Sequence, residues 1–470
     1  MANQSELHLS PGDLSGNKQS TTTIPETIIP CTQSESPQAA NAWKVLFLLF
    51  LANLLNFFDR TIPAIVVEPI RLEWGLSDLQ LGLIAGAFTL VYAVAGIPLG
   101  RLADRISRKK IMAWGLVVWS GFTALNAVAW NYVSFFMVRM GVGVGEASYA
   151  PAANSLISDL FPPEKRSRAT GIFMLGLPLG LVLAFFTVGA MITAFDSWRA
   201  PFLIAAVPGI ILAIAMFFIK EPERGQSEQR KLADDVVANP IRKLLKIPTF
   251  FWIILSGVTI NFAAYAGNGF LVPLLQRYFE ISLTQAALCT GVIVGITGLI
   301  GLTAGGWLAD KGHQFSPRGR LSVGAVSLVI AALATAGALY FSNHSLVAFV
   351  VLFGFGWLAH YNYYTSVYPT IHDIVEPRLR STAIAVYFAG MYLLGGAFGP
   401  IVVGALSDQL AQYHMTLAGQ SEMTEVFKAQ GLYDAMYLIP VALLLTGLFI
   451  WQASRHIIAD KEIRTPGQSA

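Results

Sequence analysis

The chain has 470 residues, of which 54% are apolar and 13% are charged. Soluble domains carry about 25% charged residues, so this composition, with a mean hydropathy of +0.58, excludes a soluble protein and favours an integral membrane protein. The formal net charge of +3 gives no reason to expect a nucleic-acid partner. The two cysteines, Cys31 and Cys289, provide neither a disulfide framework nor a metal-ligand spacing, so no metal or other cofactor is expected.

The sequence lacks motifs that would indicate an enzyme or an ATP-driven motor. It contains no GxxxxGK[ST] phosphate-binding loop, no HExxH and no GxSxG. Paired aspartates, a Ser/His set and His-rich metal ligands are not evident either. We therefore predict that the chain is not an enzyme. A membrane sensor without transport activity is a further alternative.

The first 40 residues differ in character from the rest of the chain. Residues 1–40 are rich in Ser, Thr, Pro, Gln and Asn and lack a periodic apolar pattern, which is typical of a disordered tail. The apolar run that begins at Trp43 is too long, and lies too far from the start, for a cleaved signal peptide. This run is predicted to be the first transmembrane helix.

Twelve apolar stretches are long enough to cross a bilayer, which takes about 20 apolar residues in a helix. A polar stretch, 220–248, separates six of them from the other six. The predicted fold is therefore all-α and integral to the membrane, with twelve transmembrane helices in two six-helix bundles. The predicted spans are 43–67, 79–100, 111–130, 133–158, 169–194, 200–219, 250–278, 284–308, 321–341, 346–371, 381–406 and 433–454. The predicted domains are a cytoplasmic N-tail (1–40), an N-terminal bundle (41–219), a cytoplasmic linker with a possible surface helix at its end (220–248), a C-terminal bundle (249–455) and a cytoplasmic C-tail (456–470).

Lys and Arg residues concentrate on one side of the predicted spans. The loops after spans 2, 4, 8 and 10 and the linker hold most of them. Cytoplasmic loops of membrane proteins carry such an excess of bases. Both termini and the linker are therefore predicted to be cytoplasmic, in a multi-pass protein of the plasma (bacterial inner) membrane. The loops on the opposite side carry few bases, namely Arg71, Arg199, Arg277 and Lys428.

The two halves of the sequence resemble each other. GRLADR (100–105) closes span 2 and GWLADK (306–311) closes span 8. Span 4 ends in SDLFPPEKR and span 10 ends in HDIVEPRLR. A repeated six-helix unit with the same orientation in both copies occurs in secondary transporters. The repeat therefore favours a transporter.

The loop GRLADRISRKK (100–110) combines small residues, one acid and several bases. Gly100 would allow two helices to approach closely, and Asp104 could pair with Arg108 or cap the N-terminus of a neighbouring helix. We predict that this loop forms a cytoplasmic gate that latches the two bundles, against the alternative that its bases only set topology. The predicted members of the gate are Gly100, Asp104, Arg105, Arg108, Asp159 and Asp310.

Four charged residues lie well inside spans 1 and 4: Asp59, Arg60, Arg139 and Glu146. A charge near the bilayer centre costs a few kcal/mol, and two acids with two bases sum to zero, so mutual pairing is expected. Asp59 and Arg60 are adjacent and point about 100° apart, and Arg139 lies two helical turns, about 10 Å, from Glu146. Each residue of span 1 is therefore predicted to pair with span 4. Cross-pairs such as Asp59 with Arg139 and Arg60 with Glu146 would join spans 1 and 4, but the sequence alone does not fix this pairing.

Ionisable residues within a membrane usually mark a substrate or proton path. Glu146 is our first candidate for a proton carrier and Asp59 the second. The arginines would gate the acid or hold an anionic substrate through forked hydrogen bonds. The alternative is a static network that fixes the register of the helices.

These motifs resemble those of known transporters. GRLADRISRKK is similar to the loop signature G-x-L-A-D-[RK]-x-G-[RK]-[RK] of the major facilitator superfamily, with Ser107 in place of the usual Gly. FFDR (57–60) and RMGVGVGEASYAPAANSLISDLF (139–161) resemble the spinster branch of that superfamily. N-x-x-D-R (56–60) also resembles its anion–cation symporter branch. The resemblance implies two six-helix bundles around a central cavity, lined mainly by spans 1, 4, 7 and 10.

The spinster resemblance also implies roles for individual residues. The acid of span 1 and the Arg and Glu of span 4 in that branch correspond here to Asp59, Arg139 and Glu146. Animal members of the branch export lysophospholipids and sphingosine phosphate, whereas the symporter branch imports sugar acids and other organic anions. The resemblance by itself does not fix the substrate.

Polar and aromatic residues, without buried charge, mark the spans of the C-terminal half. A charged wall facing an aromatic wall suits an amphipathic anion, although each tyrosine alone could simply pack in the core or anchor at an interface. We predict a monomeric, proton-coupled secondary transporter that works by alternating access and exports a lipid-like organic anion. The alternative is an importer of small anions such as sugar acids. The predicted cavity-lining residues are Asn56, Asn261, Tyr265, Asn268, His360, Tyr361, Tyr364 and Tyr387.

Overall fold

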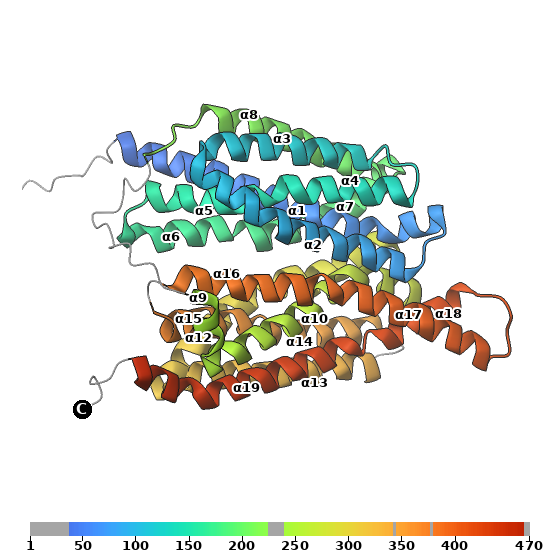
Figure 1. Cartoon of the computed structure of the whole chain (residues 1–470). Coiled ribbons are helices and arrows are strands. Elements are labelled where there is room, and N and C mark those ends of the chain that lie inside the picture. The colour runs from blue at the N-terminus through green and yellow to red at the C-terminus, as the bar shows by residue number, and fades with distance from the viewer. Residues whose placement is uncertain (1–36, 224–238, 342–344, 377–378, 465–470) are drawn as a thin grey trace, which may run out of the picture. The chain divides into compact units, whose positions relative to one another are not determined.

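The structure is a computed structural model that describes residues 37–223, 239–341, 345–376 and 379–464 (Figure 1). Most of the predicted N-tail and about half of the predicted linker lie outside these residues. The transmembrane helices belong to a unit that begins at Ala42, and the description below concerns that unit.

The N-terminal half consists of eight helices, and several of them lie in pairs along one predicted span. Predicted spans 4 and 5 are each split into two consecutive helices. The helices are α1 (Pro37–Trp74), α2 (Asp78–Arg105), α3 (Arg108–Asn126), α4 (Tyr132–Ala147), α5 (Tyr149–Leu160), α6 (Pro163–Met174), α7 (Gly176–Phe195) and α8 (Ala200–Phe218).

The C-terminal half begins with a short helix before its first span and contains two π-helical turns, η1 and η3. Its elements are α9 (Pro240–Leu245), α10 (Pro248–Tyr278), α11 (Leu283–Thr290), η1 (Gly291–Ile296), α12 (Thr297–Phe315), α13 (Gly319–Phe341), α14 (Leu346–His360), α15 (Asn362–Ile374), α16 (Arg380–Gly390), η3 (Met391–Gly396), α17 (Phe398–Leu417), α18 (Glu425–Ala435) and α19 (Leu438–Arg464).

The predicted all-helical membrane fold is confirmed, because every predicted span coincides with one helix or with consecutive helices. Ten segments of the described chain are long and apolar enough to cross a membrane. The other two spans are α3, which starts with three bases, and the α4–α5 pair, whose members have only 16 and 12 residues. The helical boundaries differ slightly from the prediction, since α1 starts at Pro37 and α19 continues to Arg464.

The sequence repeat is visible in the helix breaks. Span 4 breaks at Ser148, between α4 and α5, and span 10 breaks at Tyr361, between α14 and α15. SDLF at 158 and HDIV at 372 are 214 residues apart, and the same offset relates Glu146 to His360. Each of these two residues therefore lies just before the break of its span.

A close approach between α3 and α4 positions the charges of span 4. A Cβ added at Gly145 would lie 2.8 Å from the backbone N of Trp119, so a side chain there would push the two helices apart. The glycine lets α4 pack against α3, and α3 also packs along α8. Glu146 follows directly in the chain and is fully buried.

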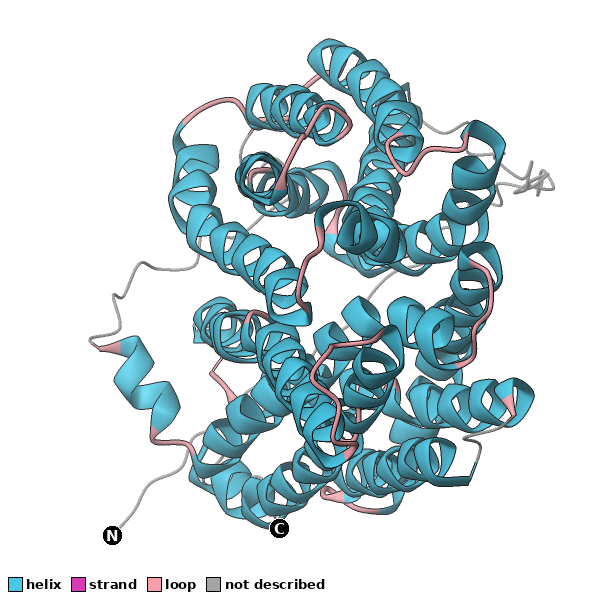
Figure 2. Cartoon of the chain, turned by 90° about the vertical axis from the view of Figure 1, so that its right-hand side faces the viewer, coloured by secondary structure: helices cyan, strands magenta, loops and turns pink. Residues whose placement is uncertain are grey.

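The two halves meet through α2 with α17 and through α7 with α11. We call the end of this unit at which α19 finishes the near end, and the opposite end, at which α2 begins, the far end (Figure 1). Figure 2 looks onto the far end. A Cβ added at Gly404 of α17 would lie 2.7 Å from the carbonyl carbon of Asp78 in α2 and still closer to its oxygen, so glycine allows backbone contact between the halves there.

Candidate functional site

Arg60 of α1 and Glu146 of α4 form an ion pair inside the helical bundle. The Nε of Arg60 lies 2.5 Å from Oε2 of Glu146, whose side chain is fully buried, whereas that of Arg60 is 13% exposed. The guanidinium of Arg60 also lies 4.0 Å from the ring centre of Tyr92. The structure thus contains one of the two predicted cross-pairs, Arg60 with Glu146.

Asp59, the neighbour of Arg60, faces α3 instead of α4. Its Oδ2 accepts hydrogen bonds from Nε1 of Trp119 at 2.9 Å and from Oγ1 of Thr123 at 3.3 Å. Among the described residues Asp59 forms no ion pair, so the expected pairing of Asp59 with Arg139 is wrong for this conformation. The reason is the angle of about 100° between adjacent side chains on a helix, which directs Arg60 to α4 and Asp59 to α3.

Arg139 is buried without an ion-pair partner in the part of the chain that the structure describes. Its guanidinium lies 4.6 Å from the ring centre of Phe88. Its Nε and Nη1 are buried and donate no hydrogen bond to any described residue, and the same holds for Nη2 of Arg60. Buried donors of this kind are costly. They can form hydrogen bonds to a carboxylate or phosphate group of a substrate.

The cluster of Asp59, Arg60, Arg139 and Glu146, here called the interior cluster, also has unused acceptors. Oδ1 of Asp59 and Oε1 of Glu146 are buried without a hydrogen-bond donor among the described residues. The interior cluster therefore offers both donors for an anion and carboxylate oxygens that can take a proton.

Three tyrosines from different helices extend the site from Arg60 toward the C-terminal half. The ring of Tyr92 (α2) lies 6.4 Å from that of Tyr392 (η3), which lies 6.1 Å from that of Tyr265 (α10). Tyr265 was predicted to line the cavity. The sequence reasoning missed Tyr92, which lies among apolar residues in span 2 and could have been found as a polar aromatic residue in an otherwise apolar helix.

Trp119 and Thr123 were also missed as partners of the interior cluster. Their spacing of four residues puts them on one face of α3, and both side chains are buried. A Trp and a Thr at this spacing in a membrane span are a usable signal for a buried acceptor, because an indole N–H and a hydroxyl seek partners when they are buried.

The other predicted cavity residues fall into two groups. Some are tied to the protein core: Asn261 donates to the carbonyl of Met391, Tyr361 donates to that of Val294, and Tyr387 shares a hydrogen bond with Tyr363 at 2.7 Å. The rest have polar atoms without a hydrogen-bond partner or lie among other rings. Nδ2 of Asn56 and Oδ1 of Asn268 are buried without a hydrogen-bond partner among the described residues. The ring of Tyr364 packs against those of Tyr363 and His360.

His360 is the counterpart of Glu146 in the repeat. It is buried, and its ring lies 5.0 Å from that of Trp357 and 4.9 Å from that of Tyr361. Neither ring nitrogen has a hydrogen-bond partner among the described residues. The two halves thus hold a titratable side chain at equivalent positions, one in a charged cluster and one among aromatic rings.

At the near end, Arg108 holds three segments together. Its guanidinium pairs with Asp159 of α5 and lies 3.1 Å from Oε1 of Glu221, which follows α8. It also donates to the carbonyl of Pro222 at 3.0 Å. Partial burial of Glu221 raises the pKa of its carboxyl. Hydrogen bonds from Ser107 and Arg108 outweigh this effect and hold the pKa below its ordinary value. These contacts lie within the N-terminal bundle or join it to the first residues of the linker.

The remaining members of the predicted gate differ in their surroundings. A Cβ added at Gly100 would lie 3.7 Å from Pro151, so this conformation does not require glycine there. Arg105 is exposed, and the side chain of Asp104 lies outside the described part. Asp310 is mostly exposed and lies 3.8 Å from Arg320.

Arg320 gives the near end of the C-terminal half a cluster similar to that of Arg108. It pairs with Asp373 at 3.1 Å. Asp373 is the second residue of HDIV, as Asp159 is the second residue of SDLF. The repeat therefore extends to a base on the third span and an acid at the end of the fourth span of each half.

At the far end, buried ion pairs join the two halves. Arg277 of α10 lies 2.8 Å from both Glu68 of α1 and Asp78 of α2, and the three side chains are at most 6% exposed. Arg71 pairs with Glu68 at 2.7 Å and with Glu425 of α18 at 2.5 Å. We call these five residues the far-end network.

Ion pairs account for each of the few bases on the sparsely charged side of the spans. Arg71, Arg199, Arg277 and Lys428 each form an ion pair. Asp408 of α17 also accepts from the backbone N–H groups of Asp78 and Leu79 at the start of α2. A hollow of about 490 Å³ borders these contacts.

The repeated helical halves and the buried charges of spans 1 and 4 are typical of a multi-pass membrane transporter. The chain belongs to the Major Facilitator Superfamily, whose sequence profile matches residues 49–400. Its predicted place near the spinster branch is confirmed by protein spinster homolog 1 of Xenopus laevis, which is 30% identical over 78% of this chain and 73% of that protein.

Two further comparisons cover nearly the whole chain. An MFS-type efflux pump of Mycolicibacterium smegmatis is 28% identical over 93% of this chain and 98% of the pump. The solved structure of a bacterial homologue of the human lysosomal transporter spinster, inward-facing and unoccupied, superposes with a TM-score of 0.82. The two sequences are 28% identical, and the superposition covers 90% of this chain and 98% of the homologue's chain. The chain is therefore a secondary transporter.

Proposed function

We propose that this transporter exports an amphipathic, lipid-like organic anion and is coupled to protons through Glu146. The observation that carries the proposal is the interior cluster, in which Arg60 and Arg139 have buried donors that the protein leaves unused. The adjacent rings of Tyr92, Tyr265 and Tyr392 can cover an apolar part of the same substrate. The efflux pump among the relatives supports export.

The donors that an anion would use are separate from the contact with Glu146. Arg60 binds Glu146 through Nε, while its Nη2 is free to contact a substrate together with Arg139. The interior cluster sums to zero charge, so a bound anion makes it −1 and a proton on Glu146 makes it +1. In the proposed exchange the protein carries the anion in the outward step and carries the proton in the return step. Asp59 is the second proton site in this scheme.

The same proposal gives the transporter an orientation and a resting state. The near end faces the cytoplasm, as the excess of bases there supports. The far-end network holds the halves together on the opposite side, and the inward-facing spinster homologue shares this fold. Both support an inward-facing protein that works by alternating access, and we propose that it acts as a monomer.

Import of a small organic anion together with a proton is the second candidate. Glu146 is the ion-pair partner that the described chain gives Arg60, so protonation of Glu146 would free the whole guanidinium to bind a carboxylate in forked geometry. Proton and anion would then move together and leave the interior cluster neutral.

Transport into proteoliposomes with an imposed pH gradient tests the proposal. A lysophospholipid and a sugar acid are compared, with the gradient applied in each direction. Exchange predicts that the lysophospholipid moves opposite to the protons, whereas symport predicts that the sugar acid moves with them. Transport of the sugar acid without any effect of the lipid would contradict the proposed substrate.

Replacing Glu146 with Gln tests the coupling. The E146Q variant should still fold, although loss of the ion-pair partner of Arg60 should lower its melting temperature. Compared at equal amounts of folded protein, it should lose the effect of the pH gradient on transport. Glu73→Gln is the matched control, because Glu73 pairs with Arg199 at the surface of the far end, away from the interior cluster. If a pH gradient still drives transport in E146Q, Glu146 is not the proton carrier and another residue must carry the proton.

A further inference from the structure

The short helix α9 lies crosswise at the near end, directly before the spanning helix α10 (Figure 1). Its Leu244 is fully buried and fixes it to the C-terminal half, where α9 packs against α10 and α16. Ile241 and Leu245 are 53% and 45% exposed. α9 therefore presents an apolar surface that the described protein leaves uncovered.

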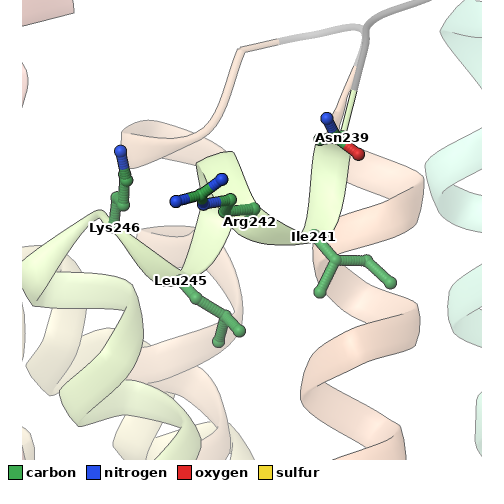
Figure 3. Close-up of a pocket in the computed structure, with 5 residues that line it drawn as sticks. All are labelled: Asn239, Ile241, Arg242, Leu245 and Lys246. Carbon is green, nitrogen blue, oxygen red and sulfur yellow. The ribbon is translucent and has the colours of Figure 1, made fainter.

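The opposite side of α9 is basic. Arg242, Lys243 and Lys246 are all exposed, and no acid occurs in the sequence between Asn239 and Tyr278. In Figure 3, Arg242 and Lys246 extend to one side of the helix, whereas Ile241 and Leu245 extend to the other. These side chains and Asn239 line a hollow of about 570 Å³.

We propose that α9 is a binding site for an anionic phospholipid of the adjacent leaflet. The headgroup phosphate would contact Arg242 and Lys246, and the acyl chains would cover Ile241 and Leu245. Interfacial helices have this division into a basic side and an apolar side. Basic segments next to a membrane span attract anionic lipids by about 1 kcal/mol for each base.

The position of α9 favours a lipid over other anionic partners. Lys246 precedes the spanning helix by two residues, so its amine lies at the level of the headgroups. A soluble anion would satisfy the bases but would leave Ile241 and Leu245 in water. An amphipathic lipid satisfies both sides of α9 at once, and this inference is independent of the transported substrate.

Counting bound lipids on the intact protein tests the site. Full-length protein in detergent is titrated with phosphatidylglycerol or phosphatidylcholine, and the adducts are resolved by native mass spectrometry. The R242Q/K243Q/K246Q variant should lose its preference for phosphatidylglycerol by about fivefold for each base removed. The control K165Q/R318Q/R455Q removes the same charge from exposed positions elsewhere and should keep the preference. An unchanged preference in the first variant, or an equal loss in both, would overturn the proposal.

A depth measurement tests the apolar side independently. A bimane label on the single cysteine of a C31S/C289S/L245C variant should be quenched by brominated phosphatidylglycerol in vesicles. The same label at Glu223→Cys, an exposed position after α8, should stay unquenched. A label at position 245 that brominated lipid does not quench contradicts the membrane contact, whatever the charge variants show.

Discussion

The far-end network and the interior cluster use the same residue types in opposite ways. In the far-end network every carboxylate and guanidinium belongs to an ion pair, and three of the four pairs run between the two halves. The interior cluster lies within the N-terminal half and contains one ion pair, together with buried donors and acceptors that the described protein leaves unused.

This difference separates charges that hold a conformation from charges that are available to a ligand. In a buried ion pair each charge compensates the other, so removing one partner leaves a buried charge without compensation. A buried guanidinium without a partner contributes little to stability and can be retained for binding. The following predictions test this division, ordered by the size of the expected change in the free energy of unfolding.

Replacing Arg277 with Met should have the largest effect. It leaves Asp78 without its base and removes the link of α10 to α1 and α2. The expected loss is about 3–5 kcal/mol, read as a lower melting temperature of the purified protein in detergent. Arg199→Met is the matched control, since Arg199 and Glu73 are 32% and 40% exposed, and the expected loss there is below about 1 kcal/mol. Equal melting of the two variants would show that the far-end network does not stabilise this conformation.

Replacing Trp119 with Phe should have the next largest effect. The variant removes the hydrogen bond from the indole to Asp59 and leaves the carboxylate with Thr123 as its donor. Hydrogen bonds to charged groups contribute about 1.5–3 kcal/mol, so the melting temperature should fall clearly. Trp114→Phe on the same helix changes a side chain that is 60% exposed and should melt like the native protein. If W119F also melts like the native protein, Asp59 does not depend on this bond.

Replacing Glu221 with Gln should have a small, pH-dependent effect. Hydrogen bonds from Ser107 and Arg108 lower the pKa of Glu221 below its ordinary value of 4.5. A lowered pKa means that Glu221 stabilises the fold above pH 4.5 and that this contribution is lost as the pH falls through the folded-state pKa. At neutral pH the free energy of unfolding of the native protein should exceed that of E221Q by up to about 1 kcal/mol. This difference should vanish in acid. The exposed Glu223→Gln control should show no such trend, and a difference that grows in acid would contradict this sign.

Replacing Arg139 with Met should have the smallest effect on stability. The described chain gives Arg139 no ion pair, so Met should leave the free energy of unfolding unchanged or increase it. Transport of the anion should nevertheless be lost, because two donors of the interior cluster are removed. Melting and proteoliposome transport are measured on the same preparation. A destabilisation as large as that of R277M would make Arg139 a structural residue.

Much of the fold follows from local sequence. The spans were predictable because hydropathy over about 20 residues decides whether a segment enters the bilayer, and α10 matches its predicted start and end within two residues. The breaks at Ser148 and Tyr361 were not predicted, because neither follows from local hydropathy. They are shared by the two halves, so comparing spans 4 and 10 could have indicated them.

The candidate site was only partly predictable. The four charges stand out in the sequence because charge in a span is costly, but their partners depend on how neighbouring helices rotate against each other. Tyr92, Trp119 and the far-end residue Arg277 come from helices that the sequence cannot orient, and the pairing of Asp59 was predicted wrongly for this reason.

The sequence by itself determined that this chain crosses a membrane in two similar halves and that it carries two acids and two bases inside its first and fourth spans. These properties depend on local composition and spacing. Only the tertiary structure decided that Arg60 pairs with Glu146, that Asp59 turns to Trp119 and that Arg277 joins the halves. Side chains 60 or more residues apart in the chain are brought together by helix packing, and packing fixes the rotation and depth of each helix.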